Sequence, residues 1–415
     1  MAEDFSFKGD FFMKKLFTVF TCLAAAFLCG KDFPSGKNAI AYQLDKAASS
    51  MTVIAETAYD PKKDEGDSVY TLYWNNKTRF EKQTVVPFST LKAGQVAWLF
   101  LTPKEAEKVK QGKSFSSTRI NIEVERKARL GFRSPQKLCV PVFPKKGRMG
   151  EIEFAGKRIQ FTAPAKVNIF SPATVDDIKL NKTPLRIWGN VSEKKFIIGR
   201  VSISPVADQN FDSKLPSVLV VGDSISMNYE KSLKAALAGK MNCRRIDGNS
   251  GDSNRGNSAL KLWLGDAPGA KSQWGVVVLN HGLHDLKQKA DPKTQKFSSA
   301  HQVEPDVYAK NIDRLLKYLT SNKYNVVWCT TTPVPNSSYG TYARRKDEDL
   351  VYNKVLLPVL KKYPQVVVCD LNAVVRNSKV FDEWRKGNNV HFYKPEEVKL
   401  LGDAVAEAIM KAYKK

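Results

Sequence analysis

The chain has 415 residues, of which 42% are hydrophobic and 26% are charged, and its formal net charge is +24. This length favours two or three domains over one, and the composition is typical of a soluble globular protein. Lysine and arginine are scattered through every segment, so the charge would either attract anionic glycans, membranes or nucleic acid or form a plain solvated surface. Because no zinc-ligand spacing, phosphate-binding loop or RNA-binding signature accompanies the charge, the sequence does not support nucleic acid as a partner.

Residues 1–30 are predicted to be a signal peptide with an upstream extension. Lys14 and Lys15 precede an uncharged stretch at 16–28 that is rich in Ala and Phe. This stretch is shorter than the roughly 20 residues that span a bilayer. Cleavage after Ala26 or Gly30 fits the small-residue preference of signal peptidases. We therefore expect a secreted or periplasmic protein without a transmembrane anchor.

Residues 31–205 are predicted to form an all-β accessory domain. Between about residues 36 and 203 the apolar residues recur with period two, broken often by Pro, Gly and Asn. In the stretch 119–126, for example, Ile120, Ile122 and Val124 share one face. Many short strands separated by turns are typical of a β-sandwich, here jelly-roll-like. Three tryptophans in these strands are candidates for a sugar-stacking platform, the alternative being core positions: Trp74, Trp98 and Trp188.

Residues 206–415 are predicted to form an α/β domain after an aperiodic linker at 204–215. Strands are expected at 217–222, 242–247, 275–281, 325–331 and 365–370. Helical patterns lie between them near 228–239, 255–264, 304–322 and 345–361, and a last helix begins near Pro395. This alternation predicts a flavodoxin-like three-layer α/β/α domain with a parallel five-stranded sheet.

Four cysteines follow the predicted signal peptide, too few for a disulfide scaffold in a chain of this length. Cys329 and Cys369 both end Val-rich strands, which makes them candidates for neighbours in the sheet. They would pair in an oxidising compartment or stay as buried thiols, and the sequence leaves both open.

The apolar run that begins at Leu215 stops abruptly at Gly222, Asp223 and Ser224, where a helical pattern starts. Ser224 is therefore expected on a strand-to-helix turn, with its backbone N–H among the unpaired donors of a helix N-terminus. Such turns carry the chemistry of α/β sheets. A Ser or Asp after a turn Gly also serves as a simple helix cap, so this motif alone is ambiguous.

Three later stretches resolve that ambiguity. A Gly-rich turn at 249–256 follows the second strand, a polar cluster at 278–285 closes the third, and Asn388–Phe392 precedes the last helix. In spacing and order, the four blocks resemble those of the SGNH (GDSL-type) hydrolases over roughly residues 215–412.

The resemblance implies a serine nucleophile at Ser224 and a histidine base at His391. A serine hydroxyl is a poor nucleophile until such a base takes its proton. The family's Asp three residues before the histidine is replaced by Asn388, whose carbonyl can orient the imidazole but supplies no charge. Asp382 or a backbone carbonyl is the alternative orienting group.

The resemblance also implies an oxyanion hole built from Ser224, Gly251 and a third-block side chain. His284 occupies the position where the family has Asn, and its ring N–H can donate as an amide does if Asp285 or a neighbour fixes its tautomer. Asn280 is the alternative donor. No metal and no organic cofactor is implied.

Together these features predict a secreted serine esterase that removes acetyl or another small acyl group from a glycan by a Ser–His mechanism. One alternative is a lipid ester or thioester hydrolase. Another is a catalytically degenerate SGNH domain that binds acidic polysaccharide through its basic surface. The expected partners are an acylated glycan or small acyl ester and an anionic polysaccharide, while the acyl group, the host polymer, the oligomeric state and the role of the N-terminal domain stay open.

Overall fold

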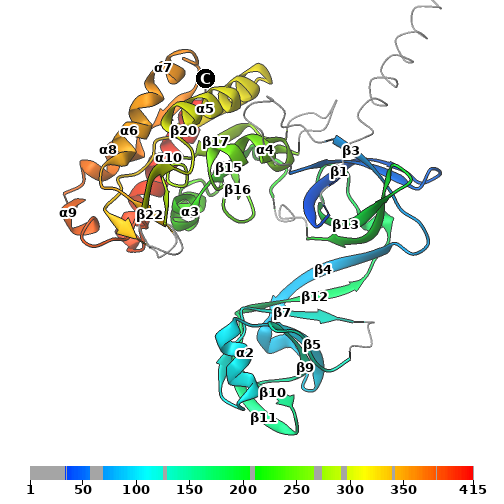
Figure 1. Cartoon of the computed structure of the whole chain (residues 1–415). Coiled ribbons are helices and arrows are strands. Elements are labelled where there is room, and N and C mark those ends of the chain that lie inside the picture. Colours follow the sequence, from blue (N-terminus) through cyan, green and yellow to red (C-terminus); the bar gives the residue numbers. More distant parts are fainter. Residues whose placement is uncertain are drawn as a thin grey trace, which may run out of the picture. The chain divides into compact units, whose positions relative to one another are not determined.

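The structure is a computed structural model of the whole chain, shown in Figure 1. It describes Phe33 and residues 35–56, 69–124, 129–205, 211–265, 273–290, 297–338, 342–379 and 381–414. The predicted signal peptide at 1–30 lies outside these residues. The chain divides into two compact units, of which unit 1 comprises residues 1–53 and 69–206 and unit 2 comprises residues 54–68 and 207–415. No helix among the described residues has the length and apolar character needed to cross a membrane.

Unit 1 is built mainly from strands, with one α-helix, α2 (Pro103–Lys110), and the 3-10 turns η2 (Phe88–Thr90) and η3 (Val175–Asp177). Its strands are β1 (Lys37–Asp45), β2 (Ser50–Ala55), β3 (Val69–Tyr73), β4 (Arg79–Pro87), β5 (Gln95–Phe100), β6 (Phe115–Ser116), β7 (Arg119–Glu123), β8 (Gly131–Ser134), β9 (Lys137–Pro144), β10 (Met149–Phe154), β11 (Lys157–Thr162), β12 (Lys166–Pro172), β13 (Pro184–Ser192) and β14 (Lys195–Ile203).

These strands form one hydrogen-bonded network in the order β13-β1-β2-β3-β14-β4-β12-β7-β5-β9-β10-β11-β6, with β8 paired to β9 outside this order. Because β13 also pairs with β14, the five strands β13, β1, β2, β3 and β14 form a closed ring of hydrogen-bonded neighbours. The network differs from the two separate sheets of the expected jelly-roll-like sandwich. The physical reason lies in β14, whose first half pairs with β3 at Phe196 and whose second half pairs with β4 from Arg200 onward.

The alternation predicted at 119–126 is present in β7 but ends earlier than expected. Ile120 and Ile122 are buried in a core shared with β5, β9 and β11, whereas Val124 lies beyond the strand and is 57% exposed. Of the three tryptophans, Trp98 is buried and Trp74 and Trp188 are half-buried.

Unit 2 alternates strands and helices along the chain. Its elements are β15 (Ser217–Gly222), α3 (Ser224–Ala236), β16 (Asn242–Arg245), α4 (Ser253–Leu264), β17 (Val276–Asn280), β18 (Gln288–Ala290), β19 (Phe297–His301), α5 (Pro305–Ser321), β20 (Asn325–Cys329), β21 (Ser337–Ser338), β22 (Tyr342–Arg344), α6 (Glu348–Val355), α7 (Leu357–Lys361), β23 (Val367–Cys369), α8 (Leu371–Arg376), α9 (Phe381–Trp384) and α10 (Pro395–Lys414).

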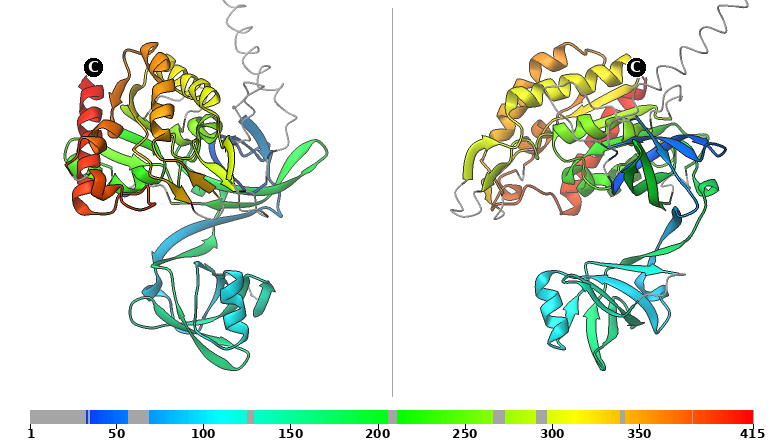
Figure 2. Two further views of the ribbon diagram at one scale, coloured as in Figure 1. Left: turned by 60° about the vertical axis from the view of Figure 1, so that its left-hand side comes forward. Right: turned by 45° about the vertical axis from the view of Figure 1, so that its right-hand side comes forward.

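The main sheet of unit 2 has five parallel strands in the order β16-β15-β17-β20-β23. Helices α3, α8 and α10 pack together on one face, and α4, α5, α6 and α7 pack on the other, as the turned views in Figure 2 show for α10 and α5. This is the doubly wound order of flavodoxin-like domains, with the chain reversing direction across the sheet between β15 and β17. The predicted α/β/α domain with its five-stranded parallel sheet is therefore present.

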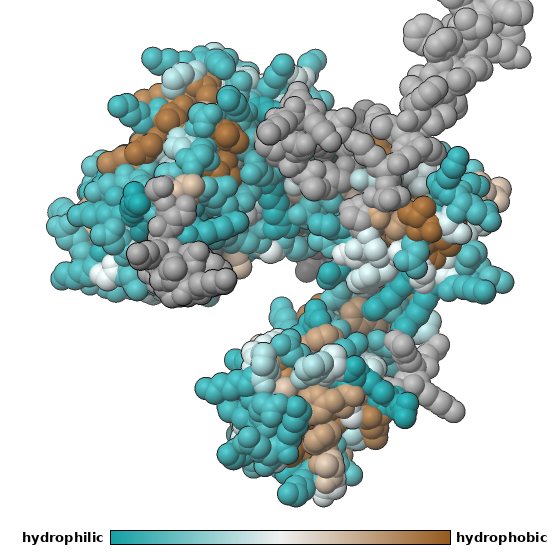
Figure 3. Space-filling view, in the orientation of Figure 1, coloured by the Kyte–Doolittle hydropathy of each residue, from teal (hydrophilic) through white to brown (hydrophobic). Residues whose placement is uncertain are grey.

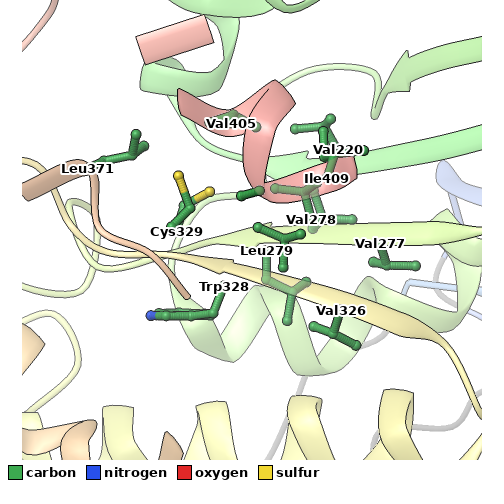
Figure 4. Packing of buried hydrophobic residues seen from close by; sticks show 14 of the residues in the cluster. Val220, Val277, Val278, Leu279, Val326, Trp328, Cys329, Leu371, Val405 and Ile409 are labelled. Atoms are coloured by element: carbon green, nitrogen blue, oxygen red, sulfur yellow. The ribbon is translucent and has the colours of Figure 1, made fainter. Parts of the chain in front are cut away.

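The core of unit 2 follows from strands that are apolar on both faces. All five residues of β17 are buried, and Figure 4 shows Val220 with Ile409 of α10 on one side of the sheet and Val326 with Trp328 on the other. Covering helices on both faces leave no polar side to these strands, which explains their unbroken apolar runs.

A second, antiparallel sheet in the order β19-β18-β22-β21 has no counterpart in the sequence-based expectation. Its strands are short and come from the segments that follow β17 and β20, so they leave little periodic signal. Because carboxyl ends of parallel strands meet at one edge, this sheet brings extra side chains to the edge where Ser224 lies.

Cys329 and Cys369 are register partners in β20 and β23, and both are free thiols, as are the other described cysteines. Cys329 and Cys369 are therefore neighbours in the sheet, as predicted, and they do not form a disulfide.

Hydrophilic side chains cover most of the face in Figure 3, with an apolar strip over unit 2, where α6 and α7 expose Leu350, Val351 and Leu357.

Candidate active site

Ser224 is the first residue of α3 and follows directly on the end of β15. Asp223 is the helix N-cap, and its carboxylate accepts a 2.9 Å hydrogen bond from the Ile225 N–H. Gly222 makes the abrupt turn possible, because a Cβ there would lie 2.7 Å from the Cβ of Ser226. The half-buried Ser224 therefore sits at the positive end of the helix dipole, with its N–H in the first turn, where such donors have no intrahelical partner.

The structure brings His391 to Ser224 across 167 positions of sequence. His391 Nε2 lies 2.8 Å from Ser224 Oγ. The loop that carries the histidine is anchored on α3, because Asn228 Oδ1 accepts a 3.3 Å hydrogen bond from the Phe392 N–H. The predicted nucleophile and base are thus within hydrogen-bonding distance.

The tautomer of His391 follows from Asn389. The Asn389 Oδ1 lies 3.0 Å from both the backbone nitrogen and the ring Nδ1 of His391. Since a backbone N–H can only donate, the atom that faces it is the amide oxygen rather than the amide nitrogen. The ring Nδ1 must then carry the proton, and Nε2 keeps the lone pair that accepts the Ser224 hydroxyl. This is the tautomer that a general base requires.

The residue seen in contact with the His391 ring is Asn389, which directly follows the predicted Asn388 in the sequence. Asn388 and Asn389 are both exposed, and the loop turns the second of them towards the ring. Asp382, the predicted alternative, lies exposed in the short helix α9. Like the predicted Asn388, Asn389 supplies an oxygen acceptor without a negative charge.

The surroundings of His391 are cationic. Burial lowers the pKa of His391 below 6.5, and Arg344, Arg385 and Lys287 lower it further. The neutral ring is therefore favoured at pH 7. The same field opposes the imidazolium that forms when the ring accepts a proton.

His284 has its own fixed tautomer. Its Nδ1 lies 2.9 Å from Lys287 Nζ. An ammonium can only donate, so Nδ1 is the acceptor and Nε2 carries the proton. Burial first, and Lys287 second, lower the pKa of His284 to about 3, so the ring is neutral at all ordinary pH values. The residue that orients His284 is the neighbouring Lys287, whose own pKa burial lowers to about 8.

Asp285 holds the second and third blocks together and does not contact the His284 ring. Its carboxylate accepts hydrogen bonds from the Ser253 N–H (2.8 Å), the Ser253 hydroxyl (2.5 Å) and the Gly282 N–H (3.1 Å). The side chain is completely buried, and burial raises its pKa to about 7. Asp285 thereby fixes the start of α4 to the loop that carries His284.

Gly251, the predicted second oxyanion donor, already has a partner. Its N–H donates to Asn249 Oδ1 at 2.8 Å, and its φ of +68° is a conformation that favours glycine. Its carbonyl oxygen lies 3.4 Å from Nδ1 of the buried His281, while the Ser250 N–H donates to the Gly222 carbonyl. These contacts hold the turn next to the end of β15.

Asn280, the alternative oxyanion donor, is the last residue of β17 and pairs in register with Gly222. Its side chain is 3% exposed, and its amide nitrogen contacts the Cys329 carbonyl at 3.4 Å. The Asn280 amide thus bridges β17 and β20 through one of its two N–H groups.

No protein-family model matches the chain, and a search of curated proteins found no match. Among solved structures, the chain resembles a lipase/acylhydrolase from Enterococcus faecalis at 16% identity and a TM-score of 0.37, over 47% of this chain and 96% of that one. It also resembles an acetyl xylan esterase at 14% identity and a TM-score of 0.35, over 46% of this chain and 99% of that one. A third is the catalytic domain of a Streptococcus pneumoniae peptidoglycan O-acetyltransferase, at 19% identity and a TM-score of 0.31, over 48% of this chain and 95% of that one.

Structures described as GDSL-like lipases are also among those that the chain resembles. All of these solved structures are similar to about half of this chain, at low sequence identity.

Three groups at this site were not predicted. Asn389 gave no signal because it neighbours an equally plausible Asn388 in the sequence. Lys287 lies three residues after His284, and only the fold shows that its ammonium faces the ring. Arg344 comes from β22, which belongs to the unexpected small sheet, and its Nε donates to the Leu283 carbonyl at 2.8 Å.

Proposed function

We propose that unit 2 is a serine hydrolase that acts on carboxylic esters. Ser224 Oγ attacks the carbonyl carbon of the ester, and its proton passes to His391 Nε2. The acyl–oxygen bond then breaks, and the same proton passes to the leaving alcohol oxygen. A water molecule repeats the sequence on the acyl-serine, which releases the acid and restores the Ser224 hydroxyl.

The oxyanion of the tetrahedral intermediate would be stabilised by the Ser224 N–H and the Nε2–H of His284. A donor of this kind contributes roughly 3 kcal/mol in other enzymes. Gly251 joins this set only if its N–H leaves Asn249, so we assign it a secondary role. The cationic groups Lys287 and Arg344 favour negative charge on the substrate oxygen, which offsets their unfavourable effect on the imidazolium.

One observation carries the proposal: the 2.8 Å contact between Nε2 and Ser224 Oγ in a ring whose tautomer Asn389 fixes. A domain that only binds ligand needs neither the contact nor the tautomer. This favours an active enzyme over the degenerate polysaccharide-binding alternative.

The substrate that we propose is a glycan carrying acetyl or another small acyl group, with removal outside the cytoplasm. Support comes from the predicted signal peptide at 1–30 and from the strand-rich accessory domain predicted at 31–205. Lipid esters and thioesters are the competing substrates, and a comparison of kcat/KM for acetylated xylooligosaccharide, a long-chain ester and an acyl thioester distinguishes them.

Labelling with a fluorophosphonate tests the enzyme directly, because the probe reacts only with an activated serine. We expect labelling of the parent and none of Ser224→Ala, with hydrolysis of p-nitrophenyl acetate lost in the same variant. Ser226→Ala is the matched control, since Ser226 lies two residues further along α3 and its hydroxyl donates to the Asp223 carbonyl. Equal labelling of Ser224→Ala and the parent would exclude the assigned nucleophile, and an unlabelled, inactive parent would favour the binding-only alternative.

A further inference from the structure

Unit 1 contains a cleft of about 460 Å³ that has no part in the chemistry proposed above. Described residues from one face of its network line it: Asn38, Gln83, Trp98, Phe100, Arg119, Asn121, Glu123, Lys137, Asn168, Phe170, Arg186, Trp188, Arg200, Ser202 and Ser204. We call these residues the basic cleft. They come from β1, β4, β5, β7, β9, β12, β13 and β14, most of which are labelled in Figure 1, except for Ser204, which directly follows β14. The volume is within the roughly 300–1000 Å³ of small-ligand sites.

The strands that form the basic cleft are apolar on their other face. In β7, Arg119 and Asn121 face the cleft while Ile120 and Ile122 are buried in the core. In β13, likewise, Ile187 between Arg186 and Trp188 is completely buried. The polar and aromatic side chains therefore lie together on one face of neighbouring strands. Such a shared face is typical of a ligand-binding site, whereas polar residues without a binding role are spread over the surface.

The charge of the cleft is unbalanced. Of the described residues that line it, four are cationic and one, Glu123, is acidic. Glu123 lies 3.6 Å from Arg79, and Arg200 is paired with the buried Glu81, to which its Nε donates at 2.6 Å. These pairs take up the available carboxylates.

Arg119 and Arg186 have no carboxylate partner within ion-pair distance in the described part of the chain. The guanidinium of Arg119 lies 3.8 Å from the centre of the Phe100 ring, and that of Arg186 lies 5.3 Å from Trp188 and donates to the Gly36 carbonyl at 2.9 Å. The aromatic rings thus hold both cations in place. Burial lowers the pKa of Arg119, and the nearby Arg186 lowers it further, so the two charges repel one another until an anion lies between them.

Uncharged polar groups complete the lining. Gln83 donates to Asn168 at 2.8 Å, and Asn168 donates to Asn121 at 3.0 Å, which forms a ladder of amides across β4, β12 and β7. An amide offers both donors and acceptors, as a sugar hydroxyl requires. Ser202 and Ser204 add hydroxyl groups beside this ladder.

We infer that the basic cleft binds an acidic oligosaccharide, with its carboxylate or sulfate group held by Arg119 and Arg186 and its hydroxyls by the amide ladder. Guanidinium groups match the planar oxygens of such anions. Single-stranded nucleic acid fits less well, because it needs aromatic faces for base stacking. Here cationic side chains cover the aromatic faces. The Trp98 ring, for example, is covered by Lys137, whose Nζ lies 4.2 Å from the ring centre. The inference is independent of ester hydrolysis, because the described residues that line the cleft all belong to unit 1.

The test is calorimetric titration of the full chain carrying Ser224→Ala, so that turnover does not interfere. The probes are oligogalacturonate for carboxylate, a sulfated dextran oligosaccharide for sulfate, and dextran oligosaccharide of the same length as the neutral control. We expect saturable binding of at least one acidic probe, with affinity falling steeply between 50 and 200 mM salt on the general grounds that exposed charges are screened beyond about 8 Å. Which acidic probe binds more tightly identifies the anion.

Arg119→Gln and Arg186→Gln should each weaken that binding at least tenfold. Arg158→Gln is the matched control, since Arg158 is also an arginine of unit 1 that lies over an aromatic ring, 3.4 Å from the centre of Phe143, but is outside the cleft. It should change affinity less than twofold. If either cleft variant is unfolded by circular dichroism, Ser202→Val and Lys137→Met replace it. The inference is overturned if neither acidic probe binds, if Arg158→Gln weakens binding as much as the cleft variants do, or if a single-stranded oligonucleotide binds more tightly through the same residues.

Discussion

Asn389→Asp should raise the activity of the enzyme, because it adds a negative charge beside the ring where imidazolium forms. The substituted carboxylate can accept the same two hydrogen bonds, each 3.0 Å long, that the amide oxygen of Asn389 now accepts from His391. Ring orientation and tautomer are therefore retained. What changes is the charge in a pocket whose other ionised neighbours, Arg344, Arg385 and Lys287, are all cationic.

The expected magnitude follows from the distance. Two unit charges about 4 Å apart interact by about 1 kcal/mol in water and about 4 kcal/mol at an effective dielectric constant of 20. Because residue 389 is exposed and His391 is half-buried, we expect about 2 kcal/mol, which corresponds to roughly 1.5 pKa units. The transition state carries only part of the imidazolium charge, so kcat should rise about tenfold, with about 30-fold as the upper bound.

The assay is the pH dependence of kcat/KM for p-nitrophenyl acetate. His391 must be neutral to accept the proton, so activity rises as the pH increases through its pKa. In the parent this pKa is below 6.5, and the acidic limb should therefore lie below pH 6.5. In Asn389→Asp the limb should move to higher pH while the plateau rises.

Asn388→Asp is the control, because it introduces the same charge one residue away from the ring contact. It should shift the limb by less than half as much. The reasoning is refuted if Asn388→Asp matches or exceeds Asn389→Asp, or if Asn389→Asp leaves the acidic limb where it is in the parent.

Three further outcomes are expected. His284→Phe should lower kcat about 100-fold by removing an oxyanion donor, with KM within twofold, and His284→Asn should recover part of the rate; equal kcat in His284→Phe and the parent would exclude this donor. Lys287→Met should move the acidic limb to higher pH, because the variant lacks the ammonium group that helps to lower the pKa of His391. If the acidic limb stays where it is in the parent, Lys287 has no such effect on His391. Asp285→Ala should lower the free energy of unfolding in urea by about 3 kcal/mol, because the buried donors of Ser253 and Gly282 lose their acceptor, and a loss below 1 kcal/mol would show that water replaces it.

The architecture of unit 2 and the candidate positions Ser224 and His391 could be predicted from the sequence alone. Apolar runs such as 217–222 are local signals of buried strands, and their alternation with helical patterns leaves a doubly wound sheet as the arrangement that buries them all. Ser224 was identifiable because a strand-to-helix turn is a local feature. His391 was identifiable because its block precedes the last helix in the order that the family resemblance implies.

The tertiary structure alone decided which neighbours act on those two residues. Whether Asn388 or Asn389 meets the His391 ring depends on the path of an irregular loop, which is set by contacts such as the one between Asn228 and Phe392. The orientation of His284 by Lys287 and the effect of Arg344 on the pKa of His391 likewise depend on distances in the folded chain. No periodic pattern in the sequence encodes these distances. The basic cleft of unit 1 shows the same limit, because Arg119 and Arg186 are 67 positions apart in sequence and meet only through the pairing order of their strands, and residue patterns within one strand carry no record of that order.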